Sequence, residues 1–233
     1  MKNITLITIF VLFTSCAELQ QISEEISKSG ELTGQQIASG LKEALRKGVE
    51  EEVAKLAQEG GFYNNPSVRI ELPEQLASVE TSLRKVGLGN LTDKGIEALN
   101  ATAQKAVKEA TPIFLNAIQE ITFEESKKIL LGDNTAATAY LKNKTQEKLY
   151  QKFEPVVKSN FQKVGADGIW ENLIQKYNQI PFTQNVNPDL TDYVTKEALK
   201  GVYKMIEREE IEIRNNINER TTYLLKRVFA LQD

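Results

Sequence analysis

The spacing of the apolar residues is the feature that most constrains the fold of this chain. In the first long stretch, apolar residues recur at steps of three and four, which is the period of one face of an α-helix. These positions are Ile37, Leu41, Leu45, Val49, Val53 and Leu56. Strict apolar–polar alternation, the mark of a half-buried strand, is nearly absent from the chain. The sequence therefore predicts an all-α fold, an irregular multi-helix bundle of about seven or eight helices.

Glycine, proline and capping residues divide the remaining helical patterns. Thr33 with Gln36 and Thr122 with Glu125 have the spacing of capping boxes, which begin helices. The further apolar patterns occupy residues 76–86, 96–110, 113–121, 140–157, 169–177, 199–213 and 224–229. Residues 68–72 are predicted to be a short extended piece and residues 180–188 a loop. No repeat of fixed period is present, so one irregular bundle is favoured over a solenoid.

The first residues have the pattern of a bacterial lipoprotein signal. Lys2 precedes an apolar run from Ile4 to Phe13, and small residues then precede Cys16, the single cysteine. The run is about half of the roughly 20 residues that a membrane-spanning helix needs. We therefore expect cleavage before Cys16 and acylation of its sulfur, with an ordinary cleaved signal peptide as the alternative. Ala17, rather than an aspartate, follows Cys16 and favours the outer membrane, with the body facing the periplasm.

These features predict three regions. They are a signal peptide over residues 1–15, a lipidated N-terminus and tether over residues 16–32, and a single all-helical domain over residues 33–233. The membrane is the expected partner, through the acyl chains on Cys16.

Composition excludes several functional classes. The formal charge is −3, and it becomes −4 when Lys2 leaves with the signal, so nucleic acid is not an expected partner. Electrostatic adsorption to anionic lipid is disfavoured for the same reason. The chain has no histidine, which rules out Ser-His-Asp and Cys-His catalysis and the usual zinc sites. No disulfide is possible with Cys16 acylated, and we expect no cofactor and no metal.

Six segments resemble a known bacterial family. They are residues 61–66 (GFYNNP), 83–89 (LRKVGLG), 133–138 (DNTAAT), 177–182 (YNQIPF), 189–195 (DLTDYVT) and 220–226 (RTTYLLK). On these segments the chain, from about Thr33 to Phe229, is similar to the family called domain of unknown function 4197. The resemblance implies a helical, exported envelope protein. It supplies no catalytic or binding residues to transfer.

The segment from Gly132 to Thr138 is the first candidate site. Asp133, Asn134 and Thr135 precede a predicted helix, and the free backbone N–H groups at a helix start can bind an anion. Lys142 or Lys144 would add positive charge. In the alternative interpretation Asp133 or Asn134 simply caps the helix.

Two loops that combine aromatic residues, asparagine and proline form the second candidate site. Tyr63 and Asn64 in one loop, with Tyr177 and Asn178 in the other, are suited to lining a mostly apolar ligand pocket. In the alternative interpretation these side chains tie the loops to the bundle through hydrogen bonds to the backbone.

Runs of charge and a terminal amphipathic helix have simpler interpretations. Residues 207–214 and 50–52 are rich in glutamate, but di-metal bundles typically use Glu-x-x-His pairs, so we expect solvated, salt-bridged faces. The helix over residues 224–229 has the makeup of a helix that binds a membrane surface or a partner. Docking onto the bundle needs no further assumption and is preferred.

The resulting expectation is a non-enzymatic, membrane-anchored envelope lipoprotein. It would bind a small apolar or anionic ligand, or a protein partner. The alternatives are a structural or assembly factor of an outer-membrane complex, and an envelope enzyme that uses carboxylates or tyrosine.

Overall fold

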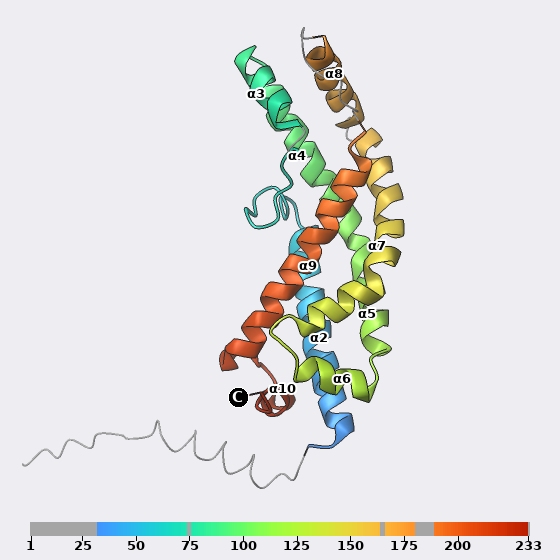
Figure 1. Cartoon of the computed structure of the whole chain (residues 1–233), viewed down its shortest axis with the longest axis vertical. Helices are drawn as coiled ribbons and strands as arrows, with labels where there is room; N and C mark the ends of the chain where they lie inside the picture. The colour runs from blue at the N-terminus through green and yellow to red at the C-terminus, as the bar shows by residue number, and fades with distance from the viewer. Residues whose placement is uncertain (1–31, 74–75, 164–165, 180–188, 233) are drawn as a thin grey trace, which may run out of the picture. The chain divides into compact units, whose positions relative to one another are not determined.

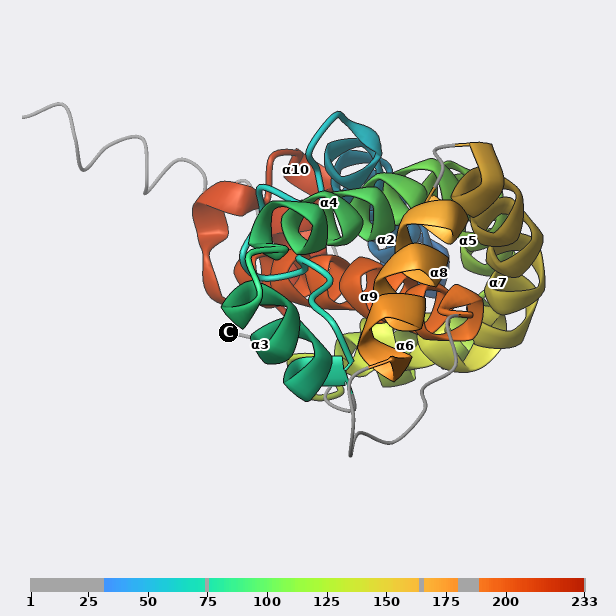
Figure 2. The same cartoon turned by 90° about the horizontal axis from the view of Figure 1, so that it is seen from above.

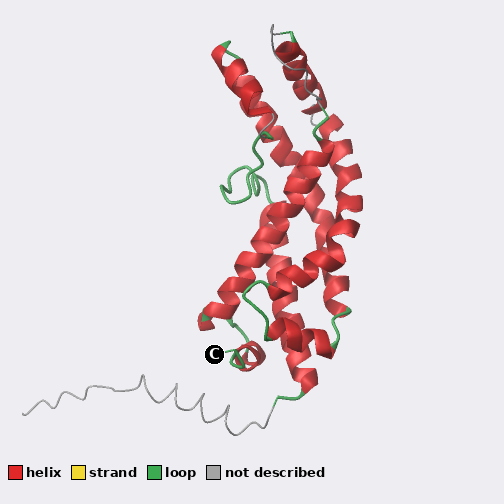
Figure 3. Ribbon diagram, in the orientation of Figure 1, coloured by secondary structure: helices red, strands yellow, loops and turns green. Residues whose placement is uncertain are grey.

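The computed structural model describes residues 32–73, 76–163, 166–179 and 189–232. Helices supply all the regular secondary structure of these described residues, as Figure 3 shows. The predicted all-α bundle is thereby confirmed. The apolar run of the signal, Cys16 and the predicted loop over residues 180–188 lie outside the described residues. The chain divides into two units, Met1–Thr33 and Gly34–Asp233, and helices α2 to α10 lie in the second.

Helix α2 (Gly34–Ala57) is the predicted first helix, and it contacts α5, α6, α9 and α10. Its apolar stripe is buried from Leu41 onward, with Leu41, Val49 and Val53 at most 3% exposed, whereas Ile37 in the first turn is half-buried. The spacing of three and four residues placed these side chains on one face, and the neighbouring helices cover that face.

Helices α3 (Ala77–Lys85) and α4 (Gly89–Ala106) meet at a glycine turn. Gly87 has a φ of +80°, and the N–H groups of Gly87 and Leu88 bond to the carbonyls of Arg84 and Leu83. This arrangement is a Schellman motif, which a residue with a Cβ would strain. The sequence placed Val86 on the apolar face of this helix, but Val86 is 63% exposed because the helix has already ended.

A 3-10 turn and two short helices follow. They are η2 (Val107–Glu109), α5 (Ala110–Gln119) and α6 (Phe123–Leu130). Pro112 lies in the first turn of α5, where a missing N–H costs nothing. At the start of α6, the Thr122 hydroxyl accepts from the N–H of Glu125, and the N–H of Thr122 donates to the Glu125 carboxylate. The predicted capping box is confirmed.

Two long helices, α7 (Ala136–Lys163) and α9 (Thr191–Asn215), lie side by side, with α8 (Ala166–Asn178) between them in the chain. Helix α7 continues through Pro155. Helix α9 also contacts α2, so it links the N-terminal helix to α7 (Figures 1 and 2). None of the helices in the described part of the chain combines the length and the apolar character needed to cross a bilayer.

The last elements are η3 (Ile217–Glu219), which contacts α9, and α10 (Tyr223–Phe229), which folds back onto α2. A Cβ built on Gly40 of α2 would lie 2.6 Å from a methyl of Val228, so the glycine allows the close approach of α10. Arg220 is 1% exposed and donates to the carbonyls of Ile213 and Arg214. The expected docking of the terminal helix onto the bundle is confirmed.

The connection from α2 to α3 packs on the bundle without forming a strand. Phe62 is fully buried against Gly201 of α9. Asn100 of α4 accepts from the N–H of Ile70 and donates to its carbonyl, both at 2.8 Å. The extended piece predicted over residues 68–72 is therefore an irregular segment, and a buried asparagine provides the pairing that a neighbouring strand would have given.

Candidate functional site

A groove of about 1020 Å³ lies between α7 and α9. Its floor contains Thr138, Leu199 and Tyr203, which are at most 5% exposed. The remaining lining residues are mostly polar: Thr135, Ala139, Lys142, Gln146, Glu147, Tyr150, Asp192, Lys196, Lys200, Lys204 and Glu207. Its size matches the upper end of small-molecule sites, so the groove has room for a ligand or a short peptide segment.

Two buried hydrogen bonds fix the register of the helices beneath this groove. Thr138 of α7 donates to Glu210 of α9 at 2.8 Å, and the hydroxyls of Thr145 and Tyr203 are 2.8 Å apart. Seven residues separate the partners on each helix, so the two bonds follow an antiparallel heptad spacing. A slide of one helix along the other would break both bonds, and the groove walls are therefore held at a fixed spacing.

The two tyrosines of the groove are neutral hydrogen-bonding groups. Burial raises the pKa of Tyr203 to about 12, and its ring packs edge-on against Phe114 with the centroids 5.7 Å apart. The hydroxyl of Tyr150 donates to Asp192 at 2.8 Å, and this bond is the main reason that the pKa of Tyr150 is raised to about 12. Both phenols remain protonated near neutral pH, where they can bind a ligand but not act as bases.

Four lysines surround the groove and give it a positive rim. Lys196 pairs with Asp192 at 2.9 Å, and Lys200 pairs with a glutamate three residues earlier at 3.2 Å. Within the described parts of the chain, no carboxylate pairs with Lys142 or Lys204. These two ammonium groups, one on each helix, are therefore available to an anion in the groove.

A buried carboxylate binds the start of α7 at one end of the groove. Glu210, 6% exposed, accepts from the backbone N–H groups of Ala137 and Thr138 at 2.8 and 2.7 Å. These N–H groups belong to the first turn of α7 and have no partner within the helix. The negative charge also lies at the positive end of the helix dipole. Glu210 thus caps the start of a helix through amides that lie 73 and 72 residues earlier in the chain.

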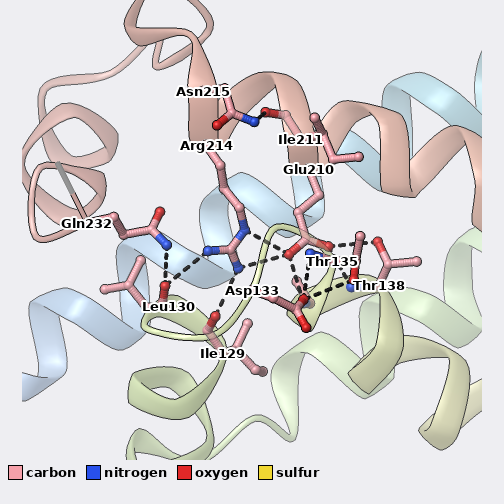
Figure 4. Close-up of polar contacts among 11 residues, drawn as sticks. Ile129, Leu130, Asp133, Thr135, Thr138, Glu210, Ile211, Arg214, Asn215 and Gln232 are labelled. Atoms are coloured by element: carbon pink, nitrogen blue, oxygen red, sulfur yellow. Dashed lines mark hydrogen bonds and ion pairs between the residues drawn. The ribbon is translucent and has the colours of Figure 1, made fainter.

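Arg214 completes this cluster one turn further along α9 (Figure 4). Its guanidinium pairs with Glu210 at 2.8 Å, and it donates to the carbonyls of Ile129 and Leu130 at 2.9 and 3.0 Å. Gln232 donates to the same Leu130 carbonyl. The cluster therefore joins the end of α6, the start of α7, the C-terminal part of α9 and the last residues described.

A comparison with family models decides where this chain belongs. A model described as a protein of unknown function, DUF4197, matches residues 31–230. The chain belongs to the DUF4197 family. The match includes both walls of the groove and the Glu210–Arg214 pair. No curated protein and no solved structure matches the chain.

In this DUF4197 chain, Asp133, Asn134 and Thr135 form the turn before α7. Asp133 accepts from the N–H and the hydroxyl of Thr135 at 2.8 and 2.9 Å, and the backbone bond is the main cause of the lowered pKa of Asp133. The predicted cap by Asp133 or Asn134 is wrong, because Glu210 occupies the N–H groups at the helix start. Because these N–H groups already donate to Glu210, they are not available to bind an external anion. Thr135 nevertheless lines the groove.

Tyr63 and Asn64 of the DUF4197 chain hold their own loop together. The ring of Tyr63 lies 4.3 Å from the Arg69 guanidinium, a cation–π contact. The N–H of Asn64 bonds to the carbonyl of Gly60 at 2.8 Å. Both contacts lie within the loop, and neither is a side-chain bond to the backbone of the bundle, so the alternative interpretation also stays a prediction.

Tyr177 and Asn178 end helix α8 rather than joining Tyr63 and Asn64. Tyr177 is 6% exposed, and its hydroxyl lies 3.5 Å from that of Ser78 on α3. Neither loop pair lines the α7–α9 groove. A ligand role for these four residues stays a prediction, and the contacts described place them apart from the groove.

The expectation of a solvated glutamate-rich face is wrong for two residues of the run 207–214. Glu210 and Arg214 are 6% and 5% exposed. The helical period contained this signal, because Glu210 follows Ile206 by four residues and precedes Ile213 by three. A charged residue at an apolar-face position indicates a buried partner.

The same correction applies to the run 50–52 of the DUF4197 chain. Glu52 is 1% exposed, pairs with Lys55 and lies 3.5 Å from Arg208 of α9. It follows Val49 by three residues on the buried face of α2. Among the residues that the structure describes, no group of three or more acidic, histidine or cysteine side chains is arranged to hold a metal ion.

Proposed function

We propose that this protein is a lipoprotein of the bacterial envelope whose helical body binds a small anionic ligand with an apolar portion in the α7–α9 groove. The observation that carries the proposal is the placement of Lys142 and Lys204, which have no ion-pair partner among the described residues, above the buried floor of Leu199 and Tyr203. The body would be anchored by acyl chains on Cys16, at the outer membrane and facing the periplasm.

The groove combines the groups that such a ligand requires. Two lysine ammonium groups on opposite walls supply charged donors, which form stronger hydrogen bonds than neutral groups do. Leu199 and the ring of Tyr203 supply apolar contact, and the floor hydroxyls supply polar contact. Because buried hydrogen bonds hold the two walls in register, little ordering would be needed on binding.

Binding without catalysis fits the chemistry of the lining. The sequence contains no histidine, and both groove tyrosines have pKa values near 12, so neither supplies a base at neutral pH. The carboxylates of the groove are exposed, and Asp192 pairs with Lys196. The groove therefore favours recognition over proton transfer.

The envelope location follows from the sequence pattern around Cys16. A charged start, a short apolar run and small residues before the only cysteine are typical of a lipoprotein signal. Labelling of cells with an alkyne fatty acid should mark the wild-type protein and not a Cys16→Ser variant. An unlabelled wild-type protein would overturn the anchor while leaving the groove to be tested separately.

The groove is tested by native mass spectrometry of the protein isolated gently from its own host. We expect an added mass that denaturation releases and that the Lys142→Gln/Lys204→Gln variant loses. Lys152→Gln, an exposed lysine of α7 outside the groove, is the matched control and should keep the mass. Equal melting temperatures would show that folding is intact. A bare wild-type mass, or an added mass that the double variant retains, would refute binding in this groove.

A further inference from the structure

Large apolar side chains are exposed on α6 and α10. Phe123 and Leu131 are 44% and 56% exposed, and Tyr223 and Leu231 are 51% and 49% exposed. Phe123 begins α6 and Leu131 directly follows its last residue; Phe123, Lys127 and Leu131 are spaced at steps of four, so they lie along one side of this helix. The apolar end is defined here as Phe123, Leu131, Tyr223 and Leu231.

Contacts with α2 bring these two helices to the end at which α2 begins. A Cβ on Gly34 would lie 2.5 Å from the ring of Phe123, so Phe123 covers the first turn of α2. The side chain of Gln232 donates to the carbonyl of Leu130. Leu231 and Leu131 are the chain neighbours of these two residues, so this hydrogen bond brings the two leucines near each other. Helices α6 and α10 both contact α2, and Figure 1 shows them at the end where α2 begins.

Basic side chains accompany the apolar ones. Lys127 and Lys128 lie one turn before Leu131, and both are exposed. The guanidinium of Arg227 lies 5.7 Å from the centre of the Tyr223 ring. Apolar side chains bordered by aromatic rings and long cationic chains suit the boundary between lipid headgroups and acyl chains. A protein partner has no such general need for this combination.

The predicted anchor joins the body at this same end. Eighteen peptide steps separate Cys16 from Gly34, so a fully extended chain spans at most about 60 Å. The start of α2 is thus the point at which the anchor is attached to the body. Tethering of this kind gives the body an effective concentration in the millimolar range at the lipid surface, and at that concentration even weak apolar contacts with the surface form.

We propose that the apolar end docks on the lipid surface, so that the first turn of α2 faces the bilayer. This inference rests on the attachment at Cys16 proposed above, and it adds an orientation that an anchor alone does not give. Docking uses the apolar side chains, with the basic ones at the headgroups, and needs no net positive charge on the body. The formal charge of −4 for the chain without its signal is compatible with it.

The test separates docking from acylation in cells. The chain from Cys16 onward has one thiol, so coupling to a maleimide lipid in phosphatidylethanolamine–phosphatidylglycerol vesicles attaches it through the same sulfur. Hydroxyl-radical footprinting then reports the exposure of each side chain. At millimolar effective concentration and a dissociation constant near 0.1 mM, modification of the apolar end should fall about tenfold. Val86, which is 63% exposed on the α3 side, is the internal control and should not change.

Two variants sharpen the result. Leu131→Ser/Leu231→Ser should restore the modification of Phe123 and Tyr223 on tethered protein, whereas Val86→Ser should leave their protection in place. Modification of the apolar end equal to that of untethered protein would overturn the docking, whatever fatty-acid labelling shows for Cys16. Protection that appears without vesicles and grows with protein concentration would also overturn it, because a second copy would then cover the surface.

Discussion

Replacing Glu210 by glutamine is expected to lower the free energy of unfolding by about 4 kcal/mol. Glutamine keeps the size of the side chain and one carbonyl oxygen, so it can accept from only one of the N–H groups of Ala137 and Thr138. It also leaves the Arg214 side chain, 2% exposed, without its carboxylate. Breaking a buried ion pair by removing one partner costs about 3–5 kcal/mol. The unsatisfied N–H places the expected loss within this range rather than below it.

Urea unfolding followed by circular dichroism measures this loss. With a slope of about 2 kcal/mol per molar urea, the midpoint should fall by about 2 M. Glu207→Gln is the matched control, because it makes the same chemical change on an exposed residue of the same helix and should stay within about 0.5 kcal/mol of wild type.

A double-mutant cycle isolates the pair itself. Glu210→Gln/Arg214→Met should be less destabilised than the sum of the two single variants, because neither buried charge is then left alone. A Glu210→Gln variant as stable as Glu207→Gln would refute the reasoning, since it would show that water already reaches the cluster. Strict additivity in the cycle would refute the pairing.

Three further substitutions have defined outcomes. Tyr203→Phe should cost about 1 kcal/mol in urea unfolding, because one buried hydrogen bond is lost while Thr145 keeps its bond to a backbone carbonyl; no change would mean that the bond is replaced by water. Thr122→Ala removes the capping hydroxyl of α6 and should cost about 1 kcal/mol, or about 2–4 °C in melting temperature, whereas Thr122→Ser should stay near wild type. Burial, with the nearby charge of Glu52, raises the pKa of Glu209 above its ordinary value of 4.5, so the ionised form is disfavoured in the fold. Glu209→Gln should therefore raise the melting temperature at neutral pH and match wild type below pH 4.5, and a difference that persists in acid would contradict this cause.

The helices were predictable because their signals are local. Steps of three and four residues, the Thr122–Glu125 box and the glycine at position 87 each lie within one or two turns of the element that they define. One failure was also local. Val86 continues the apolar pattern of α3, but the glycine turn ends the helix before that position.

The buried polar contacts of the core could be predicted only in part from the sequence. The helical period places Glu210 and Glu52 on buried faces, yet it does not name the groups that satisfy them. The cap of α7 shows the reason, since Asp133 has the right residue type next to the helix and the carboxylate that binds there comes from α9. A cap supplied by tertiary structure has no signature in the neighbouring sequence.

The groove combines a local signal with a non-local one. Lys196, Lys200 and Lys204 follow at steps of four on α9, which is a basic stripe visible in the sequence. The sequence places Lys142 within a few turns of Asp133, but it does not show that Lys142 lies on the opposite wall of a groove. Only the pairing of α7 with α9 brings the two sets together, and that pairing depends on bonds such as Thr145–Tyr203.

The carboxylate cap of α7 also has a consequence for how the chain folds. The amide hydrogens of Ala137 and Thr138 lie in the first turn of a helix, where amides usually exchange freely with solvent even after the helix has formed. Here their acceptor arrives from 72 or 73 residues away. Their protection would therefore appear only when α9 has docked, later than that of amides in the middle of α7. In a pulse-labelling experiment, the time at which these two amides become protected from exchange would report when the tertiary structure is complete.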